Sequence, residues 1–247
     1  MTDQQPENDK LHLWPFVYTN YASGAVGDEL RYSIRSLLKW KPEAEVVVVG
    51  DRPEWFNGRV IECPRISKRE FHSFQDCYFK LRTAAEQIPQ YVWMMDDIYW
   101  VQNFDLYEAI TPKYVRHVSQ QRYYAWKPGN AWAKTRARAY DWLLRNNKPT
   151  YDFAGHLPQP IRAATFLGME EELQLAGYYR NWECIYFNSY YANHAIDYGR
   201  AYTRVVKKQA EGWTPPRGCI MNHTHATYKG GVEKYLETTF GEPCKYE

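Results

Sequence analysis

The sequence predicts a single α/β domain with a mostly parallel central sheet flanked by helices. Residues 45–50 (EVVVVG) form a continuous β-branched run, which is typical of a parallel strand covered on both faces. Helical periodicity over 28–40 follows an aromatic-rich first strand at 11–18, and a helix over 71–88 leads into an apolar run at 91–100. This alternation is the pattern of a right-handed parallel sheet. With 247 residues, 45% of them hydrophobic, the chain can bury one sizeable core.

Shorter segments complete the predicted fold. Residues 1–10 are polar and are expected to form a flexible tail. The proline-punctuated segment 152–162 (DFAGHLPQPIR) is expected to be a loop. The other predicted elements are strands at 60–63 and 112–118, a short strand that begins near 218, and helices at 165–176 and 232–240.

Asp96 and Asp97 interrupt the apolar run YVWMMDDIYW at 91–100, which reads as a buried central strand. Two unpaired buried carboxylates are costly, so we expect them at the carboxyl end of that strand, where open α/β sheets bind ligands. Adjacent hard oxygen ligands suit Mg²⁺ or Mn²⁺, which share their coordination sphere with substrate phosphates. The structural alternative is a strand-end turn in which the aspartates cap the next segment.

The sequence also argues against several function classes. No G-x-G-x-x-G follows the first strand, which argues against a dinucleotide cofactor. The five cysteines are scattered without a C-x-x-C pair, so we expect reduced thiols in a cytoplasmic protein rather than disulfides or a zinc site. The chain opens without an apolar h-region and has no apolar run near 18 residues, so neither secretion nor a membrane span is expected.

Aromatic and basic residues alternate between 123 and 147. This mixture suits a surface for nucleic acid or anionic glycan. An amphipathic helix with a solvated basic face explains it equally well. The net charge of +2 is too small to indicate a polyanionic partner by itself.

Two titratable residues in the second half of the chain are candidates for proton transfer. His156 lies in a constrained loop between Gly155 and Pro158, where it could donate to or protonate a leaving group. Glu183 follows Trp182 in an apolar setting that would raise its pKa and poise it as a general base. A structural histidine and a paired structural acid are the alternatives.

Residues 218–231 (GCIMNHTHATYKGG) form the second informative stretch. Alternation in an extended segment would place His223 and His225 on one face. One of them could complete a metal sphere begun by Asp97, while Lys229 neutralises donor phosphates. Near the N-terminus, Arg31 shares a helix face with Arg35, and periodicity alone favours a solvated pair there.

Taken together, these segments resemble a GT-A glycosyltransferase, in which an acidic pair at a strand end binds the metal–diphosphate of a nucleotide sugar. More narrowly, GDELRYSIRSL at 27–37 resembles a segment of Stealth-type sugar-phosphate transferases. That family also has an acidic pair after an apolar strand, a segment like HLP at 156–158 and an ending like FGEPCKYE at 240–247. This chain departs from the family at Met95, where the family has asparagine.

In size and architecture the chain is also similar to phage-encoded transferases that glycosylate 5-hydroxymethylpyrimidines in DNA, including those associated with TET-like oxygenases. That resemblance implies DNA carrying 5-hydroxymethylcytosine as partner and acceptor, and the host-cell cytoplasm as location. We expect the protein to be a monomer or a small homo-oligomer. It also divides the chain into a nucleotide-sugar-binding half at 11–110 and an acceptor-binding half at 111–247 that carries the C-terminal metal and phosphate segment.

The GT-A resemblance assigns roles residue by residue. Asp97 would bind a divalent metal (Mn²⁺ or Mg²⁺), with His223 or His225 as a further ligand, and Asp96 would contact the ribose or sugar of a UDP-sugar donor. In an inverting reaction Glu183 would be the base, whereas in a retaining reaction His156 gains importance. The remaining substrate-binding candidates are Thr19, Asn20, Tyr21, Arg31, Lys80, Trp182 and Lys229.

Three functions therefore remain open. The leading one is transfer of sugar from a UDP-sugar to hydroxymethylated DNA. The second is a Stealth-like hexose-1-phosphate transfer to a cell-surface polysaccharide, in which UMP leaves instead of UDP. The third is a non-enzymatic DNA- or glycan-binding domain, which would leave the acidic pair and the His-x-His segment unexplained.

Overall fold

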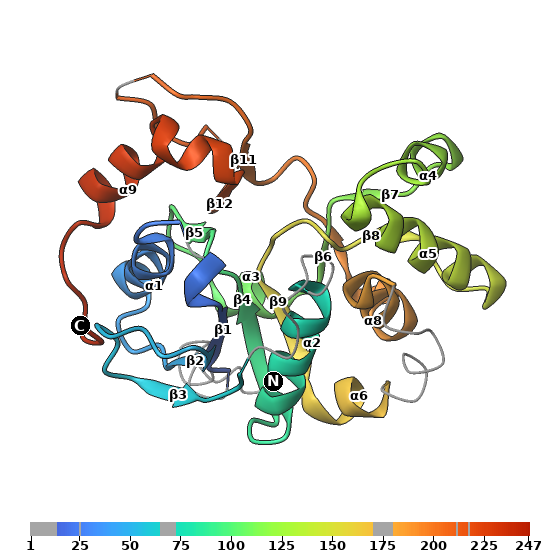
Figure 1. Ribbon diagram of the computed structural model, residues 1–247, viewed down its shortest axis with the longest axis horizontal. Helices are drawn as coiled ribbons and strands as arrows, with labels where there is room; N and C mark the ends of the chain where they lie inside the picture. The colour runs from blue at the N-terminus through green and yellow to red at the C-terminus, as the bar shows by residue number, and fades with distance from the viewer. Residues whose placement is uncertain (1–13, 25, 65–72, 170–179, 211, 217) are drawn as a thin grey trace, which may run out of the picture.

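A five-stranded sheet lies at the centre of the protein (Figure 1). The computed structural model describes residues 14–24, 26–64, 73–169, 180–210, 212–216 and 218–247. The strand order is β3-β2-β1-β4-β9, and the first four strands run parallel. These strands are β1 (Phe16–Asn20), β2 (Val46–Gly50), β3 (Arg59–Ile61), β4 (Gln90–Met94) and β9 (Gln159–Arg162).

Helices cover both faces of this sheet, as the β-branched run predicts. In β2, Val46 and Val48 pack in one apolar cluster with α1 (Glu29–Trp40). Val47 and Val49 point the other way, into a second cluster that contains residues of α2 (Ser73–Ala85). The period of two along the strand thus places a helix on each side. The mixed α/β architecture with a mostly parallel sheet is confirmed.

The apolar run at 91–100 is not one strand, but Asp96 and Asp97 do follow the carboxyl end of a central strand, as predicted. After β4 the chain leaves the central sheet, turns through Asp96 and Asp97, and forms β5 (Ile98–Trp100) in a second sheet. There β5 pairs antiparallel with β12 (Ile220–His223), which pairs parallel with β11 (Thr203–Val205). The break falls at the two carboxylates because they avoid a strand that is buried on both faces.

Two serines of the RYSIRS segment hold β5 against α1. Ser33 donates its hydroxyl hydrogen bond to the Ile98 carbonyl, and the Trp100 backbone N–H donates to Ser36 Oγ at 3.0 Å. Both serines are fully buried. Buried hydroxyls need such partners. They therefore fix the turn that carries Asp96 and Asp97 relative to the first helix.

Two further predictions in the middle of the chain need correction. The segment 152–162 is not only a loop, since it contains β9, which pairs antiparallel with β4 at the edge of the central sheet. Pro160 is tolerated there because an edge strand can forgo one donor. The strand predicted at 112–118 is two short strands, β6 (Lys113–Tyr114) and β7 (Arg116–His117). They pair with β10 (Ile196–Asp197) and β8 (Tyr151–Asp152), respectively.

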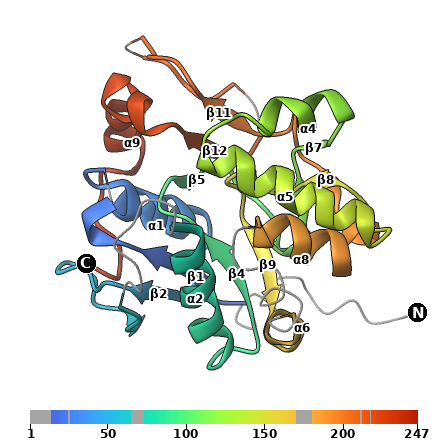
Figure 2. The ribbon, with the colours of Figure 1, turned by 45° about the vertical axis from the view of Figure 1, so that its right-hand side comes forward.

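The aromatic and basic stretch at 123–147 forms a helical hairpin. It consists of α4 (Gln120–Trp126) and α5 (Ala131–Arg145), which lie on the same side of the molecule as α8 (Trp182–Tyr190) (Figure 2). The remaining helices are η2 (Ala22–Gly24), α3 (Leu106–Ile110), α6 (Ala163–Gly168), η4 (Ala192–His194), η5 (His225–Gly230) and α9 (Val232–Phe240). The tail predicted at 1–10 and most of the helix predicted at 165–176 lie outside the described residues.

The C-terminal segment after α9 returns to the first helix. Glu247 accepts hydrogen bonds from Arg35 Nε at 2.6 Å and Arg35 Nη2 at 2.5 Å. The hydroxyl of Tyr246 accepts from the Val46 backbone N–H at 3.0 Å, at the start of β2. The segments 27–37 and 240–247, which carry the Stealth-like resemblance, are therefore in contact. Among the helices described, none has both the length and the apolar character to cross a membrane.

Candidate active site

A cavity of about 470 Å³ opens where β1 and β4 end. This is the edge at which parallel sheets of α/β proteins bind ligands. Both halves of the chain contribute to its walls. The lining residues are Thr19, Tyr21, Gly24, Val26, Glu29, Asp76, Cys77, Lys80, Met95, Asp96, Asp97, Trp132, His156, Glu183, Arg204, His223 and Thr224.

Asp96 and Asp97 lie side by side in the turn between β4 and β5. Asp97 Oδ2 is 2.8 Å from His156 Nδ1, whereas Asp97 Oδ1 is buried and has no hydrogen-bond partner within the described residues. Burial and the charge of Asp97 raise the pKa of Asp96 to about 7. Burial would also raise the pKa of Asp97, but the pairing with His156 outweighs it and holds that pKa below its ordinary value. The turn thus offers one ionised carboxylate and a neighbour that a cation would ionise.

His156 is held in place by backbone contacts on both sides. It has φ +51°, the left-handed region that non-glycine residues rarely adopt. Asn222 in β12 donates its side-chain amide to the carbonyls of Gly155 (3.2 Å) and His156 (2.7 Å). Burial lowers the pKa of His156, but Asp97 outweighs this effect and raises it above the ordinary value. The imidazole is therefore placed to orient the Asp97 carboxylate.

Glu183 faces the cavity from the first turn of α8. Asn181 caps this helix by accepting the Cys184 backbone N–H at 2.8 Å, which sets the position of the first turn. Glu183 is 3% exposed, and this burial raises its pKa to about 8. A carboxyl with such a pKa is suited to accept a proton near neutral pH.

His223 and Glu29 form a buried pair beside Asp96 and Asp97. The Thr224 carbonyl can only accept, so His223 donates from Nδ1 at 3.0 Å, and its Nε2 lies 3.0 Å from the Tyr99 hydroxyl oxygen. The same Nε2 is 3.3 Å from Glu29 Oε1. Burial, and then the charge of Asp96, raise the pKa of Glu29 to about 8. Both ring nitrogens of His223 are engaged within the protein.

Two cationic side chains reach the cavity from opposite halves of the chain. Lys80 in α2 is buried and donates to Asp76 at 2.9 Å. Arg204 lies in β11 between buried Thr203 and Val205, so strand alternation turns its exposed side chain to the cavity side. Together they can neutralise an anionic ligand that contacts the acidic turn.

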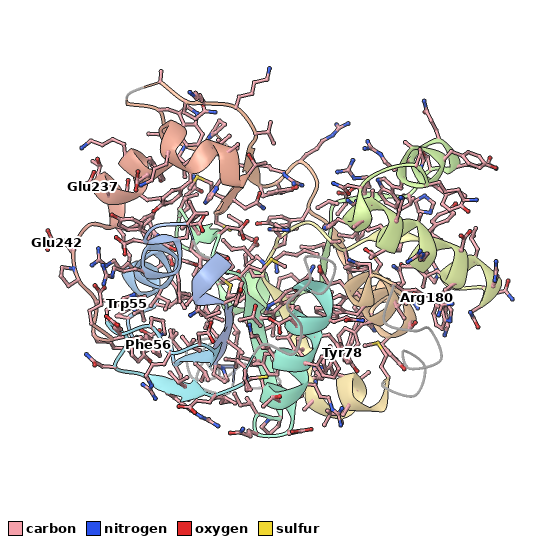
Figure 3. All side chains as sticks on the ribbon, viewed as in Figure 1. Trp55, Phe56, Tyr78, Arg180, Glu237 and Glu242 are labelled. Carbon is pink, nitrogen blue, oxygen red and sulfur yellow. The ribbon has the colours of Figure 1, made fainter. Side chains whose placement is uncertain are left out.

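Several residues predicted to bind substrate lie elsewhere. Asn20 is buried and donates to the Asp51 carbonyl at 2.8 Å. Arg31 pairs with Asp28 and Glu247 and stacks on Trp55, which Figure 3 labels away from β4.

Trp182 and Lys229 also lie outside the cavity lining. Trp182 packs in the core, 4.9 Å from the Trp93 ring centroid. Lys229 is 68% exposed and pairs with Glu233. Apolar packing and local ion pairing explain these positions better than ligand binding.

The structure brings the other predicted residues together. Thr19, Tyr21, Lys80, Asp96, Asp97, His156, Glu183 and His223 all line the cavity. His225 does not continue the strand, which ends at His223 before a 3-10 helix, so the shared extended face predicted for the two histidines is wrong. The side chain of His225 lies outside the described structure.

Glu29, Asp76, Trp132 and Arg204 line the cavity and were not predicted as site residues. Glu29 stands inside GDELRYSIRS, so the resemblance contained a signal for it. Asp76 lies four residues before Lys80, which is ion-pair spacing on a helix. Trp132 lies in the aromatic and basic stretch at 123–147, which indicated a surface but not a place in this cavity, and Arg204 carried no local signal. Both positions depend on contacts between distant segments.

The donor set fits a divalent cation bound in part by substrate. Within the part of the chain that the structure describes, no group of three or more His, Cys, Asp or Glu side chains is arranged to hold a metal ion. Asp97 Oδ1, which has no hydrogen-bond partner among the described residues, and the adjacent Asp96 can supply two oxygens. Mg²⁺ and Mn²⁺ accept such a set when water and phosphate oxygens complete the sphere.

Comparison with protein-family models found none that matches this chain, and comparison with curated proteins found no match either.

Proposed function

We propose that the protein is a metal-dependent glycosyltransferase with a GT-A-like fold, which moves a sugar from a UDP-sugar to a hydroxyl acceptor. One observation carries the proposal. Adjacent carboxylates, Asp96 and Asp97, follow a central parallel strand into a cavity that also holds Lys80, Arg204 and the buried Glu183. A metal site partly open to phosphate, two cations and a general-base candidate are the parts that sugar transfer from a nucleotide diphosphate requires.

Each residue has a role in this reaction. Asp97 and Asp96 would hold the cation, which when bound supplies positive charge for the departing diphosphate. His156 orients Asp97 through a 2.8 Å hydrogen bond to Oδ2, so Asp97 Oδ1 is left to bind the cation. Lys80 and Arg204 bind phosphate oxygens, and Thr19 and Tyr21 line the nucleotide side.

In the proposed reaction Glu183 acts on the acceptor. The acceptor oxygen forms a bond to the anomeric carbon, the bond from that carbon to the diphosphate oxygen breaks, and UDP leaves. Glu183 takes the proton of the acceptor hydroxyl in an inverting transfer. The acceptor we propose is the hydroxymethyl group of 5-hydroxymethylcytosine in DNA.

A second candidate is favoured by the contact between segments 27–37 and 240–247. Those segments carry the Stealth-like resemblance, and in the structure they pack against each other through Arg35 and Glu247. A Stealth-like enzyme would transfer hexose 1-phosphate, so the acceptor attacks the β-phosphorus and UMP leaves. The identity of the released nucleotide separates the two candidates.

The test incubates the protein with Mn²⁺, UDP-glucose or UDP-N-acetylglucosamine, and duplex DNA containing 5-hydroxymethylcytosine. Mass spectrometry of the nucleosides should detect a hexose or N-acetylhexosamine increment that Asp97→Ala abolishes, a loss of about 10⁴-fold, because the bound cation contributes several kcal/mol. Asp28→Asn, in a surface ion pair, is the matched control. Release of UMP with a glycan acceptor would establish the second candidate instead, and binding without release of either nucleotide would leave a binding domain.

A further inference from the structure

The charges of this chain are strongly segregated. Residues 113–152 contain nine Lys and Arg side chains and two Asp side chains. The rest of the chain has 22 basic and 27 acidic residues, so the net charge of +2 conceals a strongly basic segment within an acidic protein. That segment includes the α4–α5 hairpin. Segregation of this kind is the electrostatic signature of a polyanion-binding surface.

The fold arranges the exposed cations of α5 in a row. Lys134, Arg138 and Arg145 are exposed, and their spacing of four and seven residues places them within about 40° on one helix face. Asp141 lies in the same row but is half-buried and accepts the Tyr123 hydroxyl at 2.5 Å. Arg136, between Lys134 and Arg138 in the sequence, does not belong to this row. It turns inward and pairs with buried Asp152 while stacking on tryptophan rings.

A third element adds to the far end of this row. Arg180 lies just before α8. Partial burial lowers its pKa most, and the nearby charges of Arg145 and Arg138 lower it further. Figure 3 labels Arg180 beside the distal part of α5. Three guanidinium groups gathered by the fold add to the positive potential at this end of the row.

The near end of the row enters the candidate active site. Trp132, in the first turn of α5, lines the cavity, and its ring centroid is 6.1 Å from that of His156. The helix has 15 residues, so the cationic row extends about 20 Å from the cavity. At 3.4 Å per base pair this length matches about six base pairs of duplex DNA.

We propose that the outer face of α5, with Arg180, is the docking track for a nucleic-acid acceptor, and that Trp132 is the platform on which the target base stacks inside the cavity. Phosphates would contact Lys134, Arg138 and Arg145, while the base leaves the duplex to reach the reacting centre. An aromatic ring at the end of a cationic row favours nucleic acid over anionic polysaccharide, because every base has a face that stacks. What happens to the base in the cavity rests on the proposed sugar transfer, but the docking itself does not.

Fluorescence anisotropy with a labelled 20-base-pair duplex, in the absence of donor, tests the track. Neutralising Lys134, Arg138 and Arg145 together to Gln should weaken binding at least tenfold. The slope of log K against log salt should fall in magnitude by about three, one for each lost phosphate contact. The control neutralises Lys39, Lys234 and Lys245, exposed cations on the α1–α9 side, and should leave binding unchanged.

Equal loss in both triple variants would overturn the track, because it would show that only net charge matters. Binding that is insensitive to salt, or tighter binding of heparin than of DNA at the same salt, would also overturn it. Because this assay needs no donor, its failure leaves sugar transfer untouched, and a failure of sugar transfer leaves the docking result standing.

Photo-crosslinking tests the platform separately. A duplex with 5-iodouracil at the target position should crosslink to the peptide that contains Trp132, and Trp132→Ala should abolish that crosslink. Trp132→Phe keeps an aromatic face, so it should crosslink more than Trp132→Ala and less than the wild type. Crosslinks confined to peptides that do not line the cavity would overturn the platform assignment.

Discussion

The two walls of the cavity are built in different ways. One wall comes from the ends of β1 and β4 and from α2, and contributes Thr19, Lys80, Asp96 and Asp97 within the first hundred residues. The other comes from two strands, a loop and two helices of the second half. Trp132, His156, Glu183, Arg204 and His223 reach it from five separate elements or their ends.

This difference separates the expected functions of the walls. The first wall is attached to the parallel sheet, where strand ends present oxygen ligands and a buried lysine to a phosphate group. The second wall holds the proposed proton acceptor, the aromatic ring and a cation on an edge strand. We therefore expect substitutions in the first wall to affect donor and metal, and those at Glu183 to affect chemistry at the acceptor.

After Asp97→Ala, the largest effect on turnover is expected from Glu183→Gln, which tests whether the second wall acts on the acceptor. Gln cannot accept the acceptor proton, so turnover should fall about 10²–10⁴-fold while the affinity for UDP stays the same. In the wild type, turnover should rise with pH toward about 8, because Glu183 must lose its proton to act. Steady-state kinetics from pH 6 to 9 measure both effects.

The matched control for this test is Glu237→Gln, an exposed acid in α9. It should change neither rate nor pH profile. An unaffected turnover in Glu183→Gln would remove the base from the second wall and favour a retaining transfer, in which no such carboxylate is needed.

Arg204→Gln sharpens the comparison by asking whether the second wall also binds phosphate. Arg204 lines the cavity, so its loss should raise the KM for donor about 10–100-fold, the effect of one hydrogen bond to a charged group. Lys229→Gln should change it less than twofold, since Lys229 is exposed and pairs with Glu233. The dissociation constant of UDP, measured by calorimetry, gives the same information without acceptor.

The opposite result, a large effect at Lys229 and none at Arg204, would restore the prediction made from the sequence. It would also require the segment before Gly230 to move over the cavity when donor binds.

Periodic segments were predictable, and assembled ones were not. The helix predicted at 28–40 and the one at 232–240 match α1 and α9 closely, because regular apolar spacing encodes a face that must be buried. The strand at 45–50 was equally clear. In contrast, β9 has four residues and includes Pro160, so it lacks a strand signal and forms only because β4 offers an edge.

The same reasoning applies to the site. Asp96 and Asp97 were found because two carboxylates inside an apolar run conflict with burial, which is visible in the sequence. Trp132 and Arg204 gave no such conflict. The resemblance suggested a donor contact for Arg31, whereas in the structure an ion pair with Glu247, 216 positions away, holds it at the C-terminal segment.

The last test concerns stability, and it uses Glu183 again. Its pKa is about 8 in the folded chain and near 4.5 when exposed, so the folded protein binds the proton more tightly. Stability from this residue is complete below pH 4.5 and is lost as pH rises through about 8. Glu183→Gln cannot ionise and should avoid that loss.

Thermal unfolding should therefore show little difference between the two proteins at pH 5 and a more stable variant at pH 9. The gain should be about 2–4 °C for each kcal/mol recovered. Glu237→Gln should show no such pH-dependent gain. A variant that is less stable at both pH values would mean that the ionised carboxylate makes a contact that holds α8 in place. In that case the second wall would owe its geometry, as well as its chemistry, to Glu183.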